Sequence, residues 1–369
     1  MNKVGIVDIV GIKGGMDYYD RLLGKAIGNY GNKTYIFSNF DIPNDNNIKY
    51  LIYFDKNAKS KTQKTNSLVS GIKKTISYLK KNEIKSVIFH IFSFNIVIFL
   101  LLKKLKTHNF NIIVILHDVN SLGEKNFTFF RKIILNKFVS RIIVHNSFSK
   151  HELSKILKTK KDIIDIIPHG NYLGLINNKI KRVDAIKKLG LNKDIKYILF
   201  FGQIKKTKGL DILLEALQYI KDNVQLIIAG KPWQTNFDIY DSFIERNNLN
   251  KKVIKKIYYI DNDERDLLFS ASYICVIPYI KIYQSGVMLM SMSYGLPVIA
   301  SDLTPNKEII KDNKNGLLFK SKDSKNLSDK INILLSDNNL RKRISKESIN
   351  TMKNYSWEQI AEKYNKLIT

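Results

Sequence analysis

Short runs of β-branched and aromatic residues alternate with helical segments along the whole chain, and this alternation narrows the possible folds. Strands that are joined by helices pair in parallel and bury both faces of their sheet. In the first half we expect strands at residues 3–10, 33–38, 86–92, 111–118, 141–147 and 163–170. In the second half we expect them at residues 196–202, 224–230, 255–260, 273–279 and 297–302. The chain is therefore predicted to be an α/β protein with two doubly wound parallel sheets.

The region that separates the two halves is polar, contains glycine and lacks the alternation of a strand. It covers residues 171–194, and the change in pattern places the linker near its start. A chain of 369 residues with 44% hydrophobic content is long enough for two domains of roughly 150 to 200 residues each. We therefore expect an N-terminal domain at 1–172, a C-terminal domain at 173–350 and a terminal helix at 351–369.

The first residues lack the order of a signal peptide, because a short apolar run gives way at once to glycines. The single cysteine, Cys275, has no second cysteine to pair with, so nothing suggests an oxidising compartment. The apolar run Ser86–Leu102 contains polar residues and is shorter than the roughly 20 residues of a spanning helix. It predicts a buried strand followed by a buried helix. We expect a cytoplasmic protein.

The formal net charge of +28 at pH 7 favours anionic partners. Much of this charge comes from lysines scattered among asparagines and isoleucines, a pattern that biased composition also produces. No zinc-finger spacing, basic zipper or aromatic RNA-binding signature is present, so nucleic acid is not expected as the ligand. Residues 126–141 combine phenylalanines at helical spacing with basic residues. They predict either a basic amphipathic helix on an anionic membrane or, as we prefer, a helix that faces the core.

Lysines cluster between a strand and a helix in the stretch FGQIKKTKGLDILLEAL. The strand ends at Gly202, the helix begins near Gly209, and between them stand Lys205, Lys206 and Lys208. Open parallel sheets bind ligands at the carboxyl ends of their strands, where the free N–H groups of a helix start attract phosphate. The stretch therefore predicts a phosphate site; the alternative is a solvated lysine-rich loop.

A second helix start follows the strand at 273–279, in QSGVMLMSMSYGLPV. Ser285 is a good cap, and Gly286 lets a ligand approach the backbone closely. Gly295, just before Pro297, is expected to end the helix. The unpaired N–H groups and the positive end of the helix dipole would then face a diphosphate. The methionines of this helix are expected to pack in the core.

Taken together, these motifs resemble the C-terminal domain of the family 4 nucleotide-sugar glycosyltransferases. The resemblance rests on FFGQIKKTKGLDILLEAL, YICVIPY, QSGVMLMSMSYGLPVIASD and KEIIKDNKNGLLF, in that order and spacing. The first half agrees more loosely, through KGGMDYYDRLLGKAIGNYG, VILHD, IIVHNS and IIPHG. The resemblance implies the GT-B fold, in which two Rossmann-like domains face each other across a cleft. It also implies that the segment 351–369 packs back on the first domain.

The resemblance implies a donor site in the C-terminal domain. Lys208 matches the family lysine that contacts the donor diphosphate. Lys205 would replace the charge of an arginine that the family often has where Gln203 stands. Glu308 matches a glutamate near the donor, or is an exposed residue at a helix start. The residues implied at this site are Gly202, Gln203, Lys205, Lys208, Gln284, Ser285, Gly286, Val287 and Glu308.

The sequence departs from the family at the paired glutamates that usually contact the nucleoside and the sugar. These glutamates would align with Ile282 and Met290, so both are missing. Some relatives carry a QSGV form of this segment, in which Gln284, Ser285 and the helix start would make the contacts. The binding mode of the donor and the stereochemical outcome are left open by this departure.

In the N-terminal domain, VILHDVNS places His117 and Asp118 at the carboxyl end of a strand. A sugar transfer must remove a proton from the acceptor hydroxyl. His117 would position the sugar or assist that proton transfer, and Asp118 would orient the imidazole or act as the base; the alternative is a satisfied histidine at a strand end. Gly14, Gly15 and His169 are candidates for lining the cleft, although a turn is the preferred interpretation of His169.

The stretch Asp261–Leu268 contains Asp-x-Asp, which is the metal motif of a different glycosyltransferase fold. Here it precedes a helix, where Asp and Asn are natural caps. No cluster of His and Cys has the spacing of metal ligands either. We therefore expect neither a metal nor another cofactor.

The sequence thus predicts a hexosyltransferase-type enzyme. It would move a sugar from a nucleoside diphosphate sugar to a hydroxyl of a glycan or lipid-linked acceptor in cell-surface polysaccharide synthesis. Peripheral contact with the inner face of the cytoplasmic membrane is a further expectation. The alternatives are a nucleotide-sugar epimerase with the GT-B fold and a catalytically degenerate basic protein that binds a membrane or nucleic acid.

Overall fold

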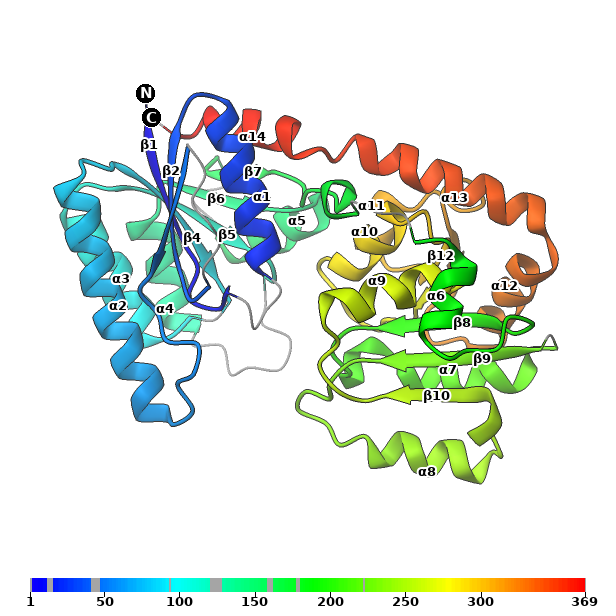
Figure 1. Ribbon diagram of the computed structural model, residues 1–369. Coiled ribbons are helices and arrows are strands. Elements are labelled where there is room, and N and C mark those ends of the chain that lie inside the picture. The colour runs from blue at the N-terminus through cyan, green and yellow to red at the C-terminus, as the bar shows by residue number, and fades with distance from the viewer. Residues whose placement is uncertain are drawn as a thin grey trace. The chain divides into compact units, whose positions relative to one another are not determined.

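The computed structural model describes residues 2–11, 16–40, 47–92, 94–119, 128–157, 162–176, 180–221 and 223–368 (Figure 1). The chain forms two compact units. The first contains Met1–Gly170 together with Tyr355–Thr369, and the second contains Asn171–Asn354. Each unit is built on one parallel sheet, so the predicted α/β architecture with two sheets is confirmed.

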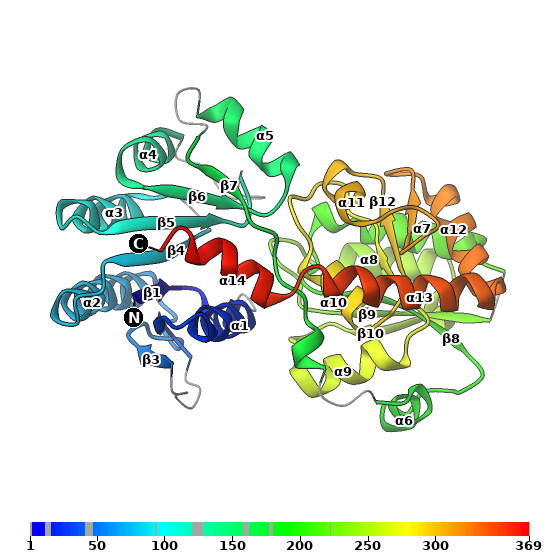
Figure 2. The same cartoon turned by 90° about the horizontal axis from the view of Figure 1, so that it is seen from above.

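The first unit has a seven-stranded parallel sheet in the order β3-β2-β1-β4-β5-β6-β7. Its strands are β1 (Lys3–Val7), β2 (Lys33–Ser38), β3 (Ile48–Ile52), β4 (Ser86–Ile91), β5 (Asn111–Leu116), β6 (Arg141–Val144) and β7 (Ile164–Ile166). Its helices are α1 (Met16–Asn29), α2 (Lys61–Lys81), α3 (Ile96–Thr107), α4 (Thr128–Ile133), the π-helical turn η2 (Ile134–Phe138), α5 (Ser147–Ile156) and α14 (Trp357–Asn365). Helices α1 and α14 pack side by side and share a core with one face of the sheet, and α2 and α3 lie on the other face (Figure 2).

The second unit has a six-stranded parallel sheet in the order β10-β9-β8-β11-β12-β13. Its strands are β8 (Lys196–Phe201), β9 (Val224–Ala229), β10 (Val253–Lys256), β11 (Ile274–Ile277), β12 (Val298–Ser301) and β13 (Leu317–Phe319). Its α-helices are α6 (Arg182–Lys188), α7 (Leu210–Ala216), α8 (Asp238–Arg246), α9 (Asn262–Ala271), α10 (Gly286–Ser293), α11 (Thr304–Ile309), α12 (Ser324–Ser336) and α13 (Asn338–Lys353). Short 3-10 helices lie at η3 (Leu173–Leu175), η4 (Lys206–Lys208), η5 (Leu217–Tyr219) and η6 (Asn250–Lys252). Helices α7, α8 and α12 enclose the main core of this unit against the sheet.

The structure corrects the expected strands at three places. Strands β3 and β13 each form one edge of a sheet and were not expected from the alternation of the sequence. Strand β10 covers Val253–Lys256 rather than 255–260. Val253 and Ile254 pair with β9, whereas Tyr258 and Tyr259 are exposed beyond the strand, so the aromatic residues misplace the boundary.

The apolar run Ser86–Leu102 forms a buried strand and then a helix, as predicted. Strand β4 is buried along its whole length. Asn95 then caps α3, because its side-chain oxygen accepts hydrogen bonds from the N–H groups of Val97 and Ile98. Among the residues that the structure describes, none of the helices is both long enough and apolar enough to cross a bilayer.

The predicted basic helix at 126–141 is shorter than expected, and Phe130 and Phe138 pack against α3, whereas Phe129 is exposed. The described part forms α4 and η2, and Arg141 already belongs to β6. The rings of Phe130 and Phe138 both lie 5.3 Å from the ring of Phe99 in α3, measured between centroids. Residues 126 and 127 lie outside the described residues. The core-facing interpretation therefore holds for Phe130 and Phe138.

Gly209 makes the tight turn between η4 and α7. Its φ of 64° lies in the left-handed region that favours glycine. A Cβ at this position would lie only 2.0 Å from the carbonyl oxygen of Pro278. The loop that carries the clustered lysines can therefore approach the end of β11 only because residue 209 has no side chain.

We expect Gly209→Ala to destabilise the protein far more than Gly190→Ala. Gly190 has nearly the same φ of 65°, but a Cβ there would have nothing within 4 Å. Gly190→Ala should therefore lower the free energy of unfolding by the backbone strain alone, about 1–2 kcal/mol. Gly209→Ala adds a clash with the carbonyl oxygen of Pro278. Urea unfolding of both variants measures the difference, and equal losses would contradict this account.

Candidate active site

The lysine-rich loop after β8 lies beside the loop after β11, because these two strands are neighbours in the sheet. Lys208 lies at the end of η4, and its Nζ is 3.6 Å from the centroid of the Tyr279 ring. The Nζ of Lys205 is 5.6 Å from the ring of Trp233. Such contacts hold a cation over the face of an aromatic ring. Gln203 is exposed in the same loop.

Helix α10 starts where the sequence predicts. Ser285 is its N-cap, and the Ser285 side chain accepts a hydrogen bond of 3.2 Å from the N–H of Met288. The first N–H groups of a helix have no acceptor within the helix, so Gly286 and Val287 present theirs at this end. Gly295, with a φ of 68°, follows the helix and ends it as predicted.

The basic loop and the start of α10 meet in the folded unit. Tyr279 is buried beside Ser285: burial raises the pKa of the Tyr279 hydroxyl, and the Ser285 side chain lowers it in part. Lys208, Tyr279 and Ser285 therefore form one connected row. A Cβ on Gly202 would lie 3.3 Å from Cγ2 of Val287, which places the end of β8 against the first turn of α10.

An unused hydrogen-bond acceptor lies next to this row. Gln284 Oε1 is buried and makes no hydrogen bond with any of the described residues. Buried polar atoms without a partner are rare, because each loses its hydrogen bonds to water without compensation. The arrangement therefore combines positive charge, free N–H groups and one acceptor, which suits a ligand that has both phosphates and hydroxyl groups.

The remaining donor candidates have different surroundings from those expected. Ile282 is buried and Met290 is half-buried, so apolar side chains fill the places of the missing glutamates. Glu308 is half-buried in the last turn of α11 and is not a helix-start residue. Tyr172 was not predicted: its hydroxyl lies 3.0 Å from the position that a Cβ on Gly286 would take. Its sequence context, HGNYL, offers no motif that would reveal this.

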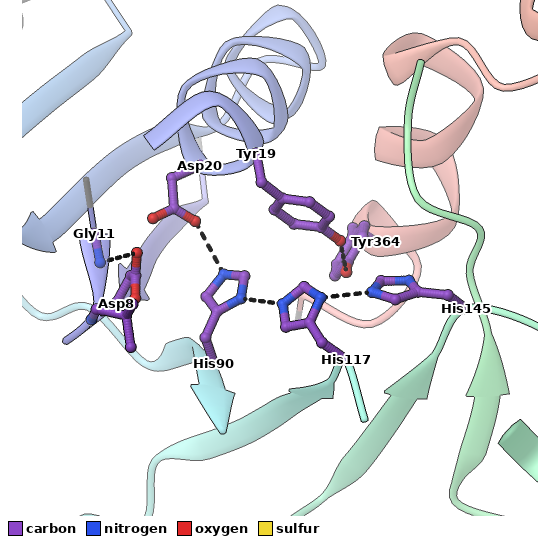
Figure 3. Close-up of polar contacts among 9 residues, drawn as sticks. Asp8, Gly11, Tyr19, Asp20, His90, His117, His145 and Tyr364 are labelled. Carbon is purple, nitrogen blue, oxygen red and sulfur yellow. Dashed lines mark hydrogen bonds and ion pairs between the residues drawn. The ribbon is translucent and has the colours of Figure 1, made fainter. Parts of the chain in front are cut away.

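In the first unit, His117 lies within a chain of buried polar side chains (Figure 3). His117 Nε2 is 2.9 Å from Nδ1 of His90, and His117 Nδ1 is 3.1 Å from Nε2 of His145. The chain continues from His145 Nδ1 to the carbonyl oxygen of Ile167 at 2.9 Å. At the other end, His90 Nε2 lies 2.9 Å from Oδ1 of Asp20, and both side chains are fully buried.

The candidate residues of the first unit have the following surroundings. Both ring nitrogens of His117 bond to other histidines, so it would have to release one of them to bond to a substrate or take its proton. Asp118 stands two residues after the end of β5 and is half-buried. His169 is buried, and its Nδ1 donates a hydrogen bond of 2.7 Å to the carbonyl oxygen of Gly170. Gly14 and Gly15 lie outside the described residues.

Burial dominates the electrostatics of this region. Burial and the neighbouring Asp20 raise the pKa of Asp8 to about 8. Burial raises the pKa of Asp20 to about 8 as well. The pKa of the histidines falls: to about 4 for His90, about 3 for His145 and about 4 for His169. Burial and the neighbouring histidines also hold the pKa of His117 well below 6.5. The buried carboxyls and imidazoles are therefore predominantly uncharged at neutral pH.

Sequence reasoning assigned no role to Asp8, Asp20, His90 and His145. A usable signal exists for three of them, because Asp8, His90 and His145 stand at the carboxyl ends of the predicted strands 3–10, 86–92 and 141–147. Within the described ranges, no group of three or more His, Cys, Asp or Glu side chains could hold a metal ion. Asp261 caps α9 and accepts a hydrogen bond from the N–H of Glu264, as expected.

The fold is that of known two-unit glycosyltransferases. The structure of sucrose-phosphate synthase from Thermosynechococcus elongatus superposes with a TM-score of 0.81, at 19% identity, over 100% of this chain and 98% of that one. HepE from Anabaena, solved in complex with UDP and glucose, gives a TM-score of 0.76 at 16% identity, over 99% of each chain. The chain therefore has the GT-B fold, as the resemblance implied.

Residues 181–351, which lie within the second unit, match the family described as glycosyl transferases group 1. An uncharacterized glycosyltransferase of Methanocaldococcus jannaschii is 25% identical over 228 residues, which are 60% of this chain and 58% of the relative. The first curated relatives are matched over half to about three-fifths of their length. The predicted resemblance to glycosyltransferases is confirmed.

We expect the protein to be most stable near pH 6.5. Histidines with a pKa lowered from 6.5 contribute stability above pH 6.5 and lose it as the pH falls toward about 4. Aspartates with a pKa raised from 3.8 to about 8 contribute stability below pH 3.8 and lose it as the pH rises through about 8. The four buried histidines outnumber Asp8 and Asp20, so stability should rise up to pH 6.5 and then decline. Thermal unfolding midpoints from pH 4 to 9 measure the curve.

The matched variant is Asp20→Asn, which removes one of the two carboxyl groups whose pKa is raised. It should make the decline above pH 6.5 shallower and leave the acid limb in place. A midpoint that climbs steadily to pH 9 would contradict the assignment of protonated carboxyls in the folded state.

Proposed function

We propose that this protein transfers a sugar from a nucleoside diphosphate sugar to a hydroxyl of a glycan or lipid-linked acceptor in cell-surface polysaccharide synthesis. The observation that carries the proposal is the row Lys208–Tyr279–Ser285, which joins the basic loop to the start of α10. When the bond to the sugar breaks, negative charge grows on the departing diphosphate. A fixed cation and a helix N-terminus stabilise that charge most where they are held in advance.

The donor roles follow from the contacts in the second unit. Lys208 and the N–H groups of Gly286 and Val287 would hold the diphosphate, and Lys205 would add a second positive charge. Gln284 Oε1, which makes no hydrogen bond to the described residues, would accept one from a hydroxyl of the sugar. Because lysines supply this positive charge, we expect transfer to proceed in the presence of a chelator. UDP is the first nucleotide to test, since HepE was solved with UDP.

The acceptor roles belong to the first unit. Asp118 stands two residues after the end of β5 and would take the proton of the acceptor hydroxyl as general base. His117 would border the acceptor through its ring, because both of its nitrogens bond to histidines. The role of Glu308 near the donor, and those of Gly14, Gly15 and His169 near the acceptor, stay proposals.

A thermal-shift screen against UDP, GDP, ADP, CMP and their sugar conjugates tests the donor site. We expect one nucleoside diphosphate to raise the unfolding midpoint, since a ligand that binds only the folded state stabilises it. Lys208→Ala and Ser285→Ala should each remove most of this shift. The controls are Lys206→Ala, an exposed lysine two positions away, and Ser60→Ala, which removes the N-cap of α2 in the other unit.

The pattern of outcomes separates the alternatives. A shift that the donor-site variants keep would move the nucleotide elsewhere in the protein. Consumption of the nucleotide sugar without any acceptor would favour an epimerase. Absence of any shift at millimolar ligand, together with salt-sensitive binding of oligonucleotides, would favour a degenerate basic binding protein.

We propose further that the first unit rests on the inner face of the cytoplasmic membrane. Ile96, Leu100 and Phe129 are exposed by 49%, 56% and 69%, and they lie on α3 and α4, which Phe99 and Phe130 hold together. Exposed lysines surround them, at positions 103, 104, 132 and 137. An apolar patch with a basic border suits a surface of anionic lipid, where side chains insert and lysines contact headgroups.

Sedimentation with phosphatidylglycerol-containing vesicles tests the membrane proposal. The double variant Ile96→Glu, Leu100→Glu should bind about a hundredfold more weakly, because each inserted aliphatic side chain contributes roughly 1.5 kcal/mol or more. Ile239→Glu is the matched control, since Ile239 is equally exposed, at 50%, on α8 of the second unit. Equal loss in the control, or equal binding to neutral vesicles, would contradict a specific lipid-binding face.

A further inference from the structure

The chain of polar side chains in the first unit follows the carboxyl edge of the sheet strand by strand (Figure 3). His90 belongs to β4, His117 follows β5, His145 follows β6 and Ile167 follows β7, and these strands are successive neighbours. Asp20 reaches the first histidine from α1. One polar group per strand therefore forms an unbroken line across half of the sheet.

The hydrogen bonds of this chain can point in only one direction. The carbonyl oxygen of Ile167 is an acceptor only, so Nδ1 of His145 must carry a proton. In a neutral imidazole the other nitrogen is then an acceptor, so His117 donates from Nδ1 to His145 Nε2. By the same rule, His90 donates from Nδ1 to Nε2 of His117. A single backbone carbonyl thus sets the tautomer of three histidines.

The same reasoning requires an additional proton at the Asp20 end. In a neutral His90 that donates from Nδ1, Nε2 has no proton, yet it lies 2.9 Å from Oδ1 of Asp20, and neither atom has a hydrogen-bond partner among the described residues. Two acceptors at this distance repel unless a proton lies between them. The proton must therefore belong to Asp20 as a carboxylic acid or to His90 as an imidazolium.

We propose that Asp20 and His90 are positioning residues that hold His117 as its Nδ1–H tautomer, with Asp20 acting as a protonated hydrogen-bond donor. The effect on catalysis rests on the function proposed above, in which His117 borders the acceptor beside Asp118. The tautomer itself does not depend on that function. Neither Asp20 nor His90 needs to touch a substrate in this role.

The surroundings favour the carboxylic acid over the imidazolium. Both Asp20 and His90 are fully buried, and a charged pair without further hydrogen bonds is costly there. Burial places the pKa of Asp20 at about 8 and that of His90 at about 4. The titratable groups that face this pair are Asp8 at the end of β1, Asp17 and Tyr19 on α1, His117, His145 and His169 at strand ends, and Tyr364 on α14.

Nitrogen NMR of the full chain with ¹⁵N-labelled histidine tests the tautomers directly. At neutral pH we expect His90, His117 and His145 to be neutral Nδ1–H tautomers, with the exposed His108 and His151 as reference signals. Single histidine variants assign the spectrum. Finding His117 protonated at Nε2, or His90 protonated at both nitrogens, would overturn the proposal whether or not the protein transfers a sugar.

Two substitutions of Asp20 extend the test to turnover. Asp20→Asn keeps a donor toward His90, so it should keep the His117 tautomer and leave kcat within about twofold of the wild type. Asp20→Leu removes the donor and should lower kcat about tenfold or more, with the KM for the donor sugar unchanged. Tyr364→Phe is the control, because it removes a buried hydroxyl that bonds to Tyr19 at 3.0 Å beside the chain.

The opposite ranking of the two variants would overturn the role of Asp20 as a donor. If Asp20→Leu does not fold, His90→Asn replaces it, because an asparagine amide can donate from the Nδ1 position without facing Asp20. That variant should keep the His117 signal of the wild type, and a change of tautomer would count against the proposal. If wild-type protein transfers no sugar, only the proposed function fails, and the spectra still decide the tautomer.

Discussion

The parallel pairing of strands is the constraint on which both candidate sites depend. When every strand of a sheet runs the same way, every segment that follows a strand begins at the same edge. In the first unit, Val7 pairs with Phe89, so Asp8 and His90 come level across the strands β1 and β4. In the second, β8 pairs directly with β11, which places the lysine loop against the segment before α10. The donor side also needs the left-handed backbone of Gly209, which lets the lysine loop approach the end of β11.

The sequence predicted the buried strands well, because a parallel strand that is buried on both faces appears in the sequence as a short apolar run. Strand β2 was predicted to the residue, and most others differ at their carboxyl ends, where polar site residues follow. The edge strands β3 and β13 escaped notice because β3 is only five residues long and partly exposed, and β13 has only three residues. Aromatic residues displaced β10, because exposed tyrosines resemble strand residues in composition.

The donor side of the candidate site could be predicted because its parts are contiguous. The residues 202–209 form one loop and 284–287 one helix start, and each carries its own local signature. The histidine chain could not be predicted in this way. Its members come from β4, β5, β6 and α1, and only the order of strands in the sheet makes them neighbours. His117 was found from its motif, but its use of both ring nitrogens depends on partners 27 and 28 residues away.

The return of the chain to the first unit through α14 has a consequence for biosynthesis. Trp357, Ile360 and Tyr364 complete the core that α1 forms on its sheet, and a Cβ on Gly170 would collide with the Trp357 ring. The ribosome delivers these residues after all of the second unit. The first unit therefore has an uncovered apolar face until α14 has been synthesised, whereas the second unit has all of its residues earlier. Nascent chains of this protein should thus need protection at the first unit while the whole of the second unit is being made.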